Sequence, residues 1–469
     1  MMRGLSCACI ALVVAGCSTP AVIYGPNDLD KTEPSGAVTA LRDLLPADGT
    51  PVRLVFVHGV GDHCSGYALN PQNGWLDDKT RKAMGLRPVQ GASKAGSIDV
   101  GIFVPGAPAQ GRSHVEFSTA TYTLRVPGTT RDVDVEAIEI TWSTLTQWIK
   151  SNQLGYDSPT TTPHTGSLGD CPQAPDTTIA STKAPPSRVW LNRVIKEEVF
   201  DRSLADAVLY SGTYQSTIER GVAEALCHAV TDTANTQKCQ WPGAPQTSQQ
   251  RFRYFFVTHS LGSRIIYDMF IHYSGYLTVG RPNPFSQAER DQAADFISAT
   301  LAHTPAFYMM ANQLALIGLS NVPPTANSGS GLHPWLELFE FQGNPNGVEP
   351  HVEGVAPRTF GNVIQFLGDA HSRAMARQGE EPTQLRIVAF NDTDDLLTWH
   401  VPPWYANAAA GTPGARPTVS VVNAFVQNAS RLLIVESPAP AHDNYFINPE
   451  VWKVISCGAT SGAVLACPD

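Results

Sequence analysis

The stretch Arg251–Asp268 reads Arg-Phe-Arg-Tyr-Phe-Phe-Val-Thr-His-Ser-Leu-Gly-Ser-Arg-Ile-Ile-Tyr-Asp, and its hydrophobic pattern changes half-way. The run Phe252–Val257 is dominated by aromatic and β-branched side chains, which predicts a fully buried strand. Apolar residues with the spacing of one helix face follow Gly262; they are Ile265, Ile266, Met269 and Phe270. One serine, Ser260, stands between the predicted strand and the predicted helix.

A sharp turn from strand to helix has chemical consequences for Ser260. Such a turn lifts the serine hydroxyl off the backbone at the end of a sheet. It also puts the next N–H, that of Leu261, at a helix N-terminus, where negative charge is stabilised. A serine in an ordinary strand–helix turn would give the same five residues, so the interpretation depends on partners elsewhere in the chain.

The pentapeptide Thr258-His259-Ser260-Leu261-Gly262 fits the nucleophile elbow Gly-x-Ser-x-Gly except at its first position. In these residues the chain resembles the α/β-hydrolase superfamily, and lipases and esterases within it. The resemblance implies an α/β-hydrolase fold: a mostly parallel central sheet flanked by helices, with loop and helical insertions. It also implies that Ser260 is the nucleophile. Thr258 is bulkier than the usual glycine, so this elbow departs from the full motif.

A second strand is predicted over Leu54–Val57, and it stops at His58-Gly59. In α/β-hydrolases, a strand that ends in His-Gly begins the loop carrying the second oxyanion donor. By that resemblance, the N–H groups of Leu261 and of Val60 or its neighbour form the oxyanion hole. Asp62 and His63 come next, and we interpret them as surface residues rather than metal ligands.

The triad acid is expected after the predicted strand Gln384–Phe390, because these folds hold the acid beyond a strand's carboxyl end. Three aspartates follow that strand. The pattern of Asp, two aliphatics and a nearby Pro-Pro resembles class 3-type lipases and selects Asp395. Another register of the superfamily selects Asp394, and Asp392 is the third alternative.

The triad base is expected to be His442. It follows the last predicted strand, Leu432–Val435, and precedes a final helix that opens near Asn448. Its sequence context resembles the C-terminal region of esterases. The chain order Ser260, Asp395, His442 is the order of α/β-hydrolases and differs from both serine-protease orders.

The N-terminus predicts export and lipidation. Residues 1–16 have the basic start, short apolar core and small-residue end of a signal peptide, and Val14-Ala15-Gly16-Cys17 resembles a bacterial lipobox. Cys17 is therefore the expected lipidation site, and Ser18 resembles lipoproteins sent to the outer membrane. Cleavage of an ordinary secretory signal near the same position is the alternative. Residues 17–50 are predicted to be a tether, with a short helix over Val38–Leu45.

Six cysteines remain after the signal peptide and Cys17 are set aside, an even number in an oxidising compartment. Short loops favour the disulfides Cys227–Cys239 and Cys457–Cys467, which leaves Cys64 with Cys171. No spacing typical of a zinc site accompanies them, so we expect no metal. The hydrolysis that the resemblance implies requires no organic cofactor, and we expect none.

Residues 51–469 are predicted to form one domain with insertions. The expected strands include Ile98–Val104, Val115–Val126 and Val135–Trp142, and the expected helices include Trp142–Lys150, Val189–Tyr210, Thr213–Val230, Pro305–Leu319 and Phe360–Arg377. Residues 151–230 and 304–345 are candidates for a cap or lid, although buried core helices are the alternative there.

Composition narrows the class of function. The chain has 469 residues, 42% hydrophobic residues and a net charge of −10 without a basic cluster, which argues against a nucleic-acid partner. The sequence predicts a lipid-anchored serine esterase or lipase acting on an ester or lipid substrate. The alternatives are an acyltransferase with the same triad and a catalytically inactive, lipid-anchored binding protein. The oligomeric state is left open.

Overall fold

The computed structural model describes residues 21–24, 36–89, 93–99, 114–154, 189, 192, 195–231, 239, 241, 252–273, 287–318, 363–401, 418–428, 438–460 and 463–465. Cys17 and the predicted last strand, Leu432–Val435, lie outside these residues. Within them, no helix combines the length and the apolar character needed to cross a bilayer.

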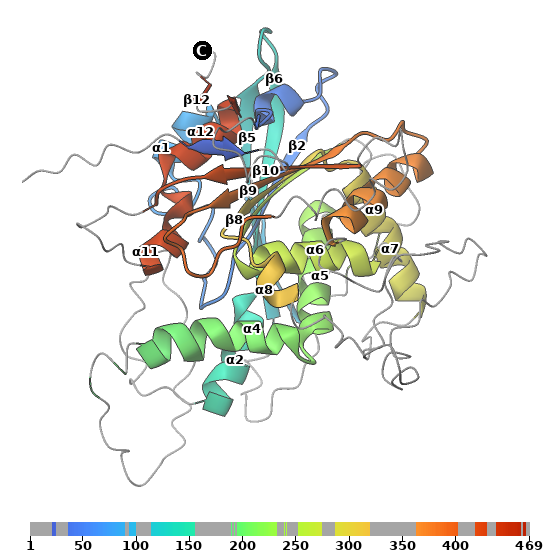
Figure 1. Cartoon of the computed structure of the whole chain (residues 1–469). Helices are drawn as coiled ribbons and strands as arrows, with labels where there is room; N and C mark the ends of the chain where they lie inside the picture. The colour runs from blue at the N-terminus through green and yellow to red at the C-terminus, as the bar shows by residue number, and fades with distance from the viewer. Residues whose placement is uncertain are drawn as a thin grey trace, which may run out of the picture.

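The protein is an α/β protein built on one large mixed sheet, which Figure 1 shows running through the centre of the molecule. The strand order is β1 (Val22–Tyr24), β10 (Val419–Phe425), β9 (Leu385–Asn391), β8 (Ala306–Met310), β7 (Arg253–His259), β2 (Val52–Val57), β6 (Asp132–Thr141), β5 (His114–Arg125) and β3 (Arg87–Pro88), with β4 (Ala95–Asp99) also paired to β5. The pairs from β10 to β6 are parallel, and those at either edge are antiparallel. The predicted mostly parallel sheet is therefore confirmed.

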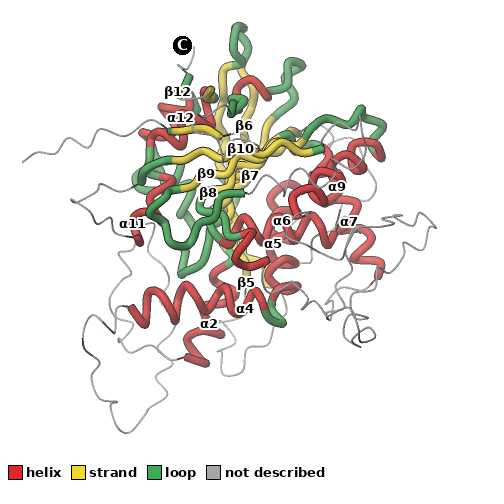
Figure 2. Tube along the Cα trace, viewed as in Figure 1, coloured by secondary structure: helices red, strands yellow, loops and turns green. Residues whose placement is uncertain are grey.

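Two apolar cores lie on opposite faces of the sheet because successive side chains of a strand point to opposite sides. In β7, Phe255 and Val257 join one core, whereas Tyr254 and Phe256 join the other. The first core is closed by η1 (Leu41–Leu44), α1 (Asp78–Met84) and α12 (Pro449–Cys457). The second is closed by α5 (Gln215–Thr231), α6 (Leu261–Tyr273), α7 (Gln287–Ala302) and α9 (Val363–Arg377). Figure 2 shows these helices on either side of the strands.

Part of the predicted tether belongs to the folded domain. β1 pairs antiparallel with β10 and extends the sheet. Val38 bridges to Ala459, and Leu41 of η1 is buried in the core beside α12. The prediction of a tether over residues 17–50 is wrong for these segments. The short helix predicted over Val38–Leu45 is present only over Leu41–Leu44, as η1, and Val38 lies in the bridge instead.

Two inner strands of the sheet, β8 and β10, differ from the prediction. Ala306–Met310, expected within a helix and at the start of a candidate lid, is the fully buried strand β8. The helix predicted over Pro305–Leu319 is therefore wrong for its first half, and in its second half the described residues form the short α8 (Leu314–Gly318). β10 was not predicted. β8 is parallel to both of its neighbours, and in such strands a continuous apolar run replaces alternation. β10 is parallel to β9 and antiparallel to β1.

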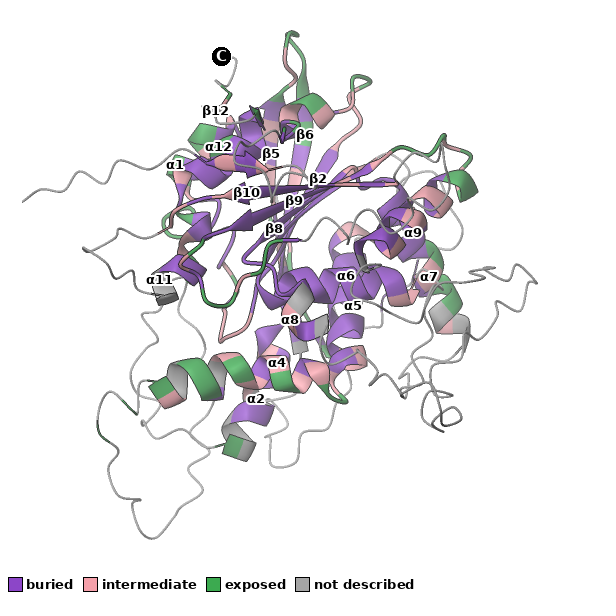
Figure 3. Cartoon of the chain, in the orientation of Figure 1, coloured by how far each residue is buried: buried purple, intermediate pink, exposed green. Residues whose placement is uncertain are grey.

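The first candidate cap region contains helices of two kinds. α5 is buried along most of its length. By contrast, the continuous helix formed by η2 (Ile195–Leu204) and α4 (Ala205–Ser211) lies beside α2 (Ser143–Leu154), and apolar side chains such as Phe200 and Val208 are exposed on it (Figure 3). Residues 155–188 of this region lie outside the described residues.

One predicted disulfide is formed in the described part of the chain. Cys227 of α5 is bonded to Cys239, with their Cα atoms 6.1 Å apart. Cys64 and Cys457 are buried. Their predicted partners, Cys171 and Cys467, lie outside the described residues, so these two pairings stay predictions.

Candidate active site

Ser260 occupies a sharp turn between β7 and α6. Its φ is +50°, in the left-handed region, and its N–H donates to the carbonyl of Met310 at the end of β8 (2.8 Å). Residues other than glycine adopt this conformation at a cost, and strained residues of this kind cluster at functional sites. The strand, the turn and the helix predicted from the sequence are thus all present around Ser260.

Thr258 fits this turn through a hydrogen bond. Its hydroxyl lies 2.8 Å from the hydroxyl of Ser263, in the first turn of α6, and both side chains are buried. The closest approach in the elbow falls instead at Gly262. A Cβ there would lie 2.4 Å from the carbonyl oxygen of His58, so only glycine lets α6 pack this tightly on the end of β2.

The structure brings Ser260, His442 and Asp395 together. Nε2 of His442 lies 3.1 Å from Oγ of Ser260, and Nδ1 lies 2.9 and 3.0 Å from the two carboxylate oxygens of Asp395. All three side chains are buried. Parallel strands explain why Ser260 and Asp395 lie close together. Ser260 follows the carboxyl end of β7 and Asp395 follows that of β9, and the carboxyl ends of parallel strands lie on the same side of the sheet. His442 comes from α11 (Pro438–Asp443).

The three competing aspartates have different partners. Asp395 contacts His442, and it also accepts hydrogen bonds from the N–H of Leu397 and the hydroxyl of Tyr445. The carboxylate of Asp392 instead accepts hydrogen bonds from the backbone N–H groups of Asp394 and Asn428. Asp394 is only half-buried. Of the three, Asp395 is therefore the one placed to orient the imidazole.

The environment of Asp392 suits a structural role. Burial raises the pKa of its carboxyl, as do the charges of Asp394 and Asp395, although the two N–H donors oppose this rise. Its own N–H donates to Tyr445 (2.6 Å), whose hydroxyl donates in turn to Asp395. Asp392 and Tyr445 thus hold the loop that presents Asp395. Tyr445 was not assigned a role from the sequence, where its only signal is its place three residues after His442.

The loop after β2 lies directly against the serine. A Cβ on Gly59 would lie 2.5 Å from Cβ of Ser260. The N–H of Leu261 is the first of α6, and the first N–H groups of a helix lack partners within it. The N–H of Gly61 already donates to Asp206 (2.8 Å), which leaves Val60 as the better second donor. An oxyanion formed at Ser260 could therefore be held by Leu261 and Val60.

Two buried histidines near the serine are held neutral. Burial, and then the neighbouring His63, keep the pKa of His58 well below its usual range. Nε2 of His58 accepts the N–H of Trp142 (3.0 Å), so Nδ1 carries the proton and donates to the Gly59 carbonyl (2.8 Å). Burial, and then His442, likewise lower the pKa of His259. Nε2 of His259 donates to the backbone carbonyl of His442 (2.9 Å) and so helps to hold that residue in place.

One group of side chains in the described residues approaches a metal-binding arrangement. Potential ligand atoms of His259, His442 and Asp443 lie within 4.8 Å of one another. However, both ring nitrogens of His442 are engaged by Ser260 and Asp395, and Nε2 of His259 donates to a carbonyl. These contacts suit proton transfer better than metal ligation.

Comparisons of this chain with protein-family models, with curated proteins and with solved structures found no match.

Proposed function

We propose that this protein is a serine hydrolase of carboxylic esters, an esterase or lipase with an α/β-hydrolase fold. The observation that carries the proposal is the hydrogen-bonded series Asp395–His442–Ser260, with the serine in a left-handed turn at a helix N-terminus. The place of β7 inside a mostly parallel sheet, with His-Gly after the adjacent β2, supports the finer fold assignment.

The geometry suits a two-step reaction through an acyl-enzyme. His442 takes the proton of Ser260 as its oxygen attacks the ester carbonyl, and Asp395 keeps the imidazole in the tautomer that accepts it. The N–H groups of Leu261 and Val60 stabilise the oxyanion. His442 then protonates the leaving alcohol. Water, deprotonated by His442, attacks the acyl group and releases the acid and Ser260.

The proposal extends to the place of action. Cys17 is proposed to carry lipid after removal of residues 1–16, which would anchor the protein in the cell envelope, at the outer membrane. Ester-containing lipids are then the nearest substrates. The proposed reaction uses side chains and backbone groups only, with no cofactor.

The decisive experiment measures hydrolysis of short-chain and long-chain p-nitrophenyl esters by the protein starting at Ser18. Ser260→Ala should lower kcat on the order of 10⁶-fold, because the nucleophile is lost. Ser298→Ala is the matched control: Ser298 is also buried but lies on α7, and its variant should retain activity. The chain-length profile would separate an esterase from a lipase.

Other outcomes would redirect the assignment. Equal rates in the wild type and Ser260→Ala would contradict the proposal. Transfer of the acyl group to an added alcohol, in preference to water, would favour the acyltransferase. Failure of a fluorophosphonate to label Ser260 in a folded protein would favour the inactive binding protein.

A further inference from the structure

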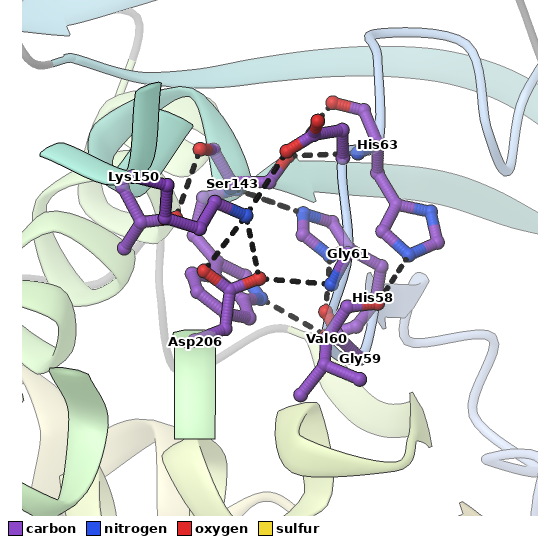
Figure 4. A network of polar contacts seen from close by, with 11 residues as sticks. His58, Gly59, Val60, Gly61, His63, Ser143, Lys150 and Asp206 are labelled. Carbon is purple, nitrogen blue, oxygen red and sulfur yellow. Dashed lines mark hydrogen bonds and ion pairs between the residues drawn. The ribbon is translucent and has the colours of Figure 1, made fainter. Parts of the chain in front are cut away.

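A buried ion-pair cluster lies behind the loop that follows β2. Lys150, on α2, is 1% exposed, and its ammonium lies 3.0 Å from a carboxylate oxygen of Asp62 and 3.0 Å from Asp206. Asp62 belongs to the loop, whereas Asp206 belongs to α4 and is completely buried. Figure 4 shows Lys150 and Asp206 pointing toward the loop from the two helices.

The cluster reaches the loop backbone itself. Asp206 accepts the N–H of Gly61 at 2.8 Å, and Gly61 has φ of +101°, a conformation that favours glycine. The peptide between Val60 and Gly61 is thus fixed from one side by a buried carboxylate. Lys150 holds that carboxylate and the side chain of the next residue, Asp62, at the same time.

The rest of the loop is tied to the start of α2. His58 accepts the N–H of Trp142, and its ring stacks on the indole with centroids 5.0 Å apart. The N–H of His63 donates to the hydroxyl of Ser143 (3.0 Å), which donates back to the carbonyl of His63 (2.7 Å). The segment from His58 to His63 is therefore held at both ends and in the middle.

We propose that Asp206 and Lys150 are positioning residues that hold the loop after β2 so that the N–H of Val60 faces the oxyanion formed at Ser260. The inference rests on the proposed function and extends it, because it assigns the placement of one oxyanion donor to α4 and α2. Neither residue touches the serine in this arrangement; they act through Gly61 and Asp62.

The chain offers a matched control for Asp206. Asp201 lies on the same continuous helix, is also buried, and forms an ion pair with Lys196 of that helix. Asp201→Ala removes the same kind of group without touching the loop. Asp206→Asn is the conservative variant, because its amide oxygen can still accept the N–H of Gly61 and leaves Lys150 paired with Asp62.

The first readout is kinetic. Asp206→Ala should lower kcat for p-nitrophenyl esters about 10²-fold, as expected when one oxyanion donor is displaced. KM should change less than about threefold, since the lost interaction is made in the transition state. Asp206→Asn should recover most of the activity, and Asp201→Ala should match the wild type. Equal losses in Asp206→Ala and Asp201→Ala, or a folded Asp206→Ala with normal kcat, would overturn the inference.

The second readout is amide hydrogen exchange of a peptide that spans His58 to His63, which needs no substrate. Asp206→Ala should speed exchange there, whereas Asp201→Ala should not. If Asp206→Ala does not fold, Lys150→Gln replaces it, with the same expected change in exchange and kcat. Unchanged exchange in the folded variant would overturn the inference. A wild-type protein inactive on every ester, with the exchange effect present, would overturn the proposed function but support the positioning of the loop.

Discussion

At the scale of single residues, Asp394 and Asp395 are neighbours in the chain but lie in different environments. Both follow β9, and both carry a carboxylate. Asp395 is buried, and its carboxylate contacts His442. Asp394 is only half-buried, and its backbone N–H donates a hydrogen bond to the carboxylate of Asp392. Of the two carboxylates, that of Asp395 is the one that contacts the imidazole of His442.

This difference predicts unequal effects of the same substitution. Asp395→Asn should lower kcat about 10⁴-fold, because an amide favours the wrong imidazole tautomer. Asp394→Asn should leave kcat within about threefold of the wild type, since that side chain takes no part in orienting His442. Steady-state kinetics on one p-nitrophenyl ester would measure both, and similar losses in the two variants would argue against the assignment.

Residue-level prediction worked where the signal is local. The strand, turn and helix around Ser260 lie within one stretch, and the three aspartates follow one strand, so sequence could place the serine and restrict the acid. Lys150 and Asp206 lie 56 residues apart, and their contact depends on how two helices pack. No local sequence pattern predicts that contact. The ion-pair cluster of Lys150, Asp62 and Asp206 could therefore be recognised only from the structure.

At the scale of elements, the contact between α6 and the end of β2 organises the site. Gly262 brings α6 against the carbonyl groups of Val57 and His58, which a Cβ would approach to 2.6 and 2.4 Å. These are backbone atoms at the end of a central strand and in the residue that follows it, so they have little freedom to move. The same contact sets the distance between Ser260 and the loop that starts at His58.

Gly262→Ala should therefore destabilise the protein by roughly 1–3 kcal/mol or more, because the added methyl group overpacks a rigid backbone contact. It should also lower kcat by displacing the loop. Gly379→Ala is the control: Gly379 has φ of +73° but open space around it. There we expect about 1 kcal/mol from backbone strain alone. Urea unfolding would measure both, and an equal effect would show that the close contact adds nothing.

Elements were predicted well where length or turn residues marked them and poorly where they did not. β7 and β9 are buried strands that end at polar residues, and both were predicted. Ala306–Met310 is an apolar run of five residues, too short for periodicity to separate a strand from a buried helix. Its place in the sheet is decided by pairing with β7 and β9, which are distant in sequence.

At the scale of the whole molecule, the buried histidines make acid a source of instability. Burial is the first cause that lowers the pKa of six described histidines: His58, His63, His259, His303, His371 and His400. The pKa of His371, on α9, falls to about 4. His272 is an exception, since Glu219 raises its pKa against the effect of burial.

The free energy of unfolding should consequently fall as the pH is lowered from about 6.5 to about 4, because the unfolded chain binds more protons in that range. Above pH 6.5 the stabilisation from these neutral histidines is complete. His272 acts in the opposite sense: its contribution is present at low pH and is lost as the pH rises through its raised pKa. Glu139, Asp206 and Asp392, whose pKa values burial raises, act in the same sense as His272. Since six histidines act against these four groups, we expect the acid loss to dominate.

His371→Gln provides the test, because this side chain lies on α9, outside the candidate active site. Its wild-type contribution is at most about 3 kcal/mol between pH 6.5 and 4, at about 1.4 kcal/mol for each unit of pKa. Urea unfolding at several pH values should give a shallower pH slope for the variant. An identical slope would mean that His371 is not held neutral in the folded state.

The pairing of β1 with β10 has a consequence for where the protein can work. Val22, the first residue of β1, follows the proposed lipidation site Cys17 by only five positions. An extended chain spans about 3.5 Å per residue, so a lipid on Cys17 would keep this edge of the sheet within about 20 Å of the bilayer. Asp395 follows β9, only two strands from that edge. The candidate active site would then lie close to the membrane surface, and lipid substrates would reach it by lateral diffusion within the bilayer.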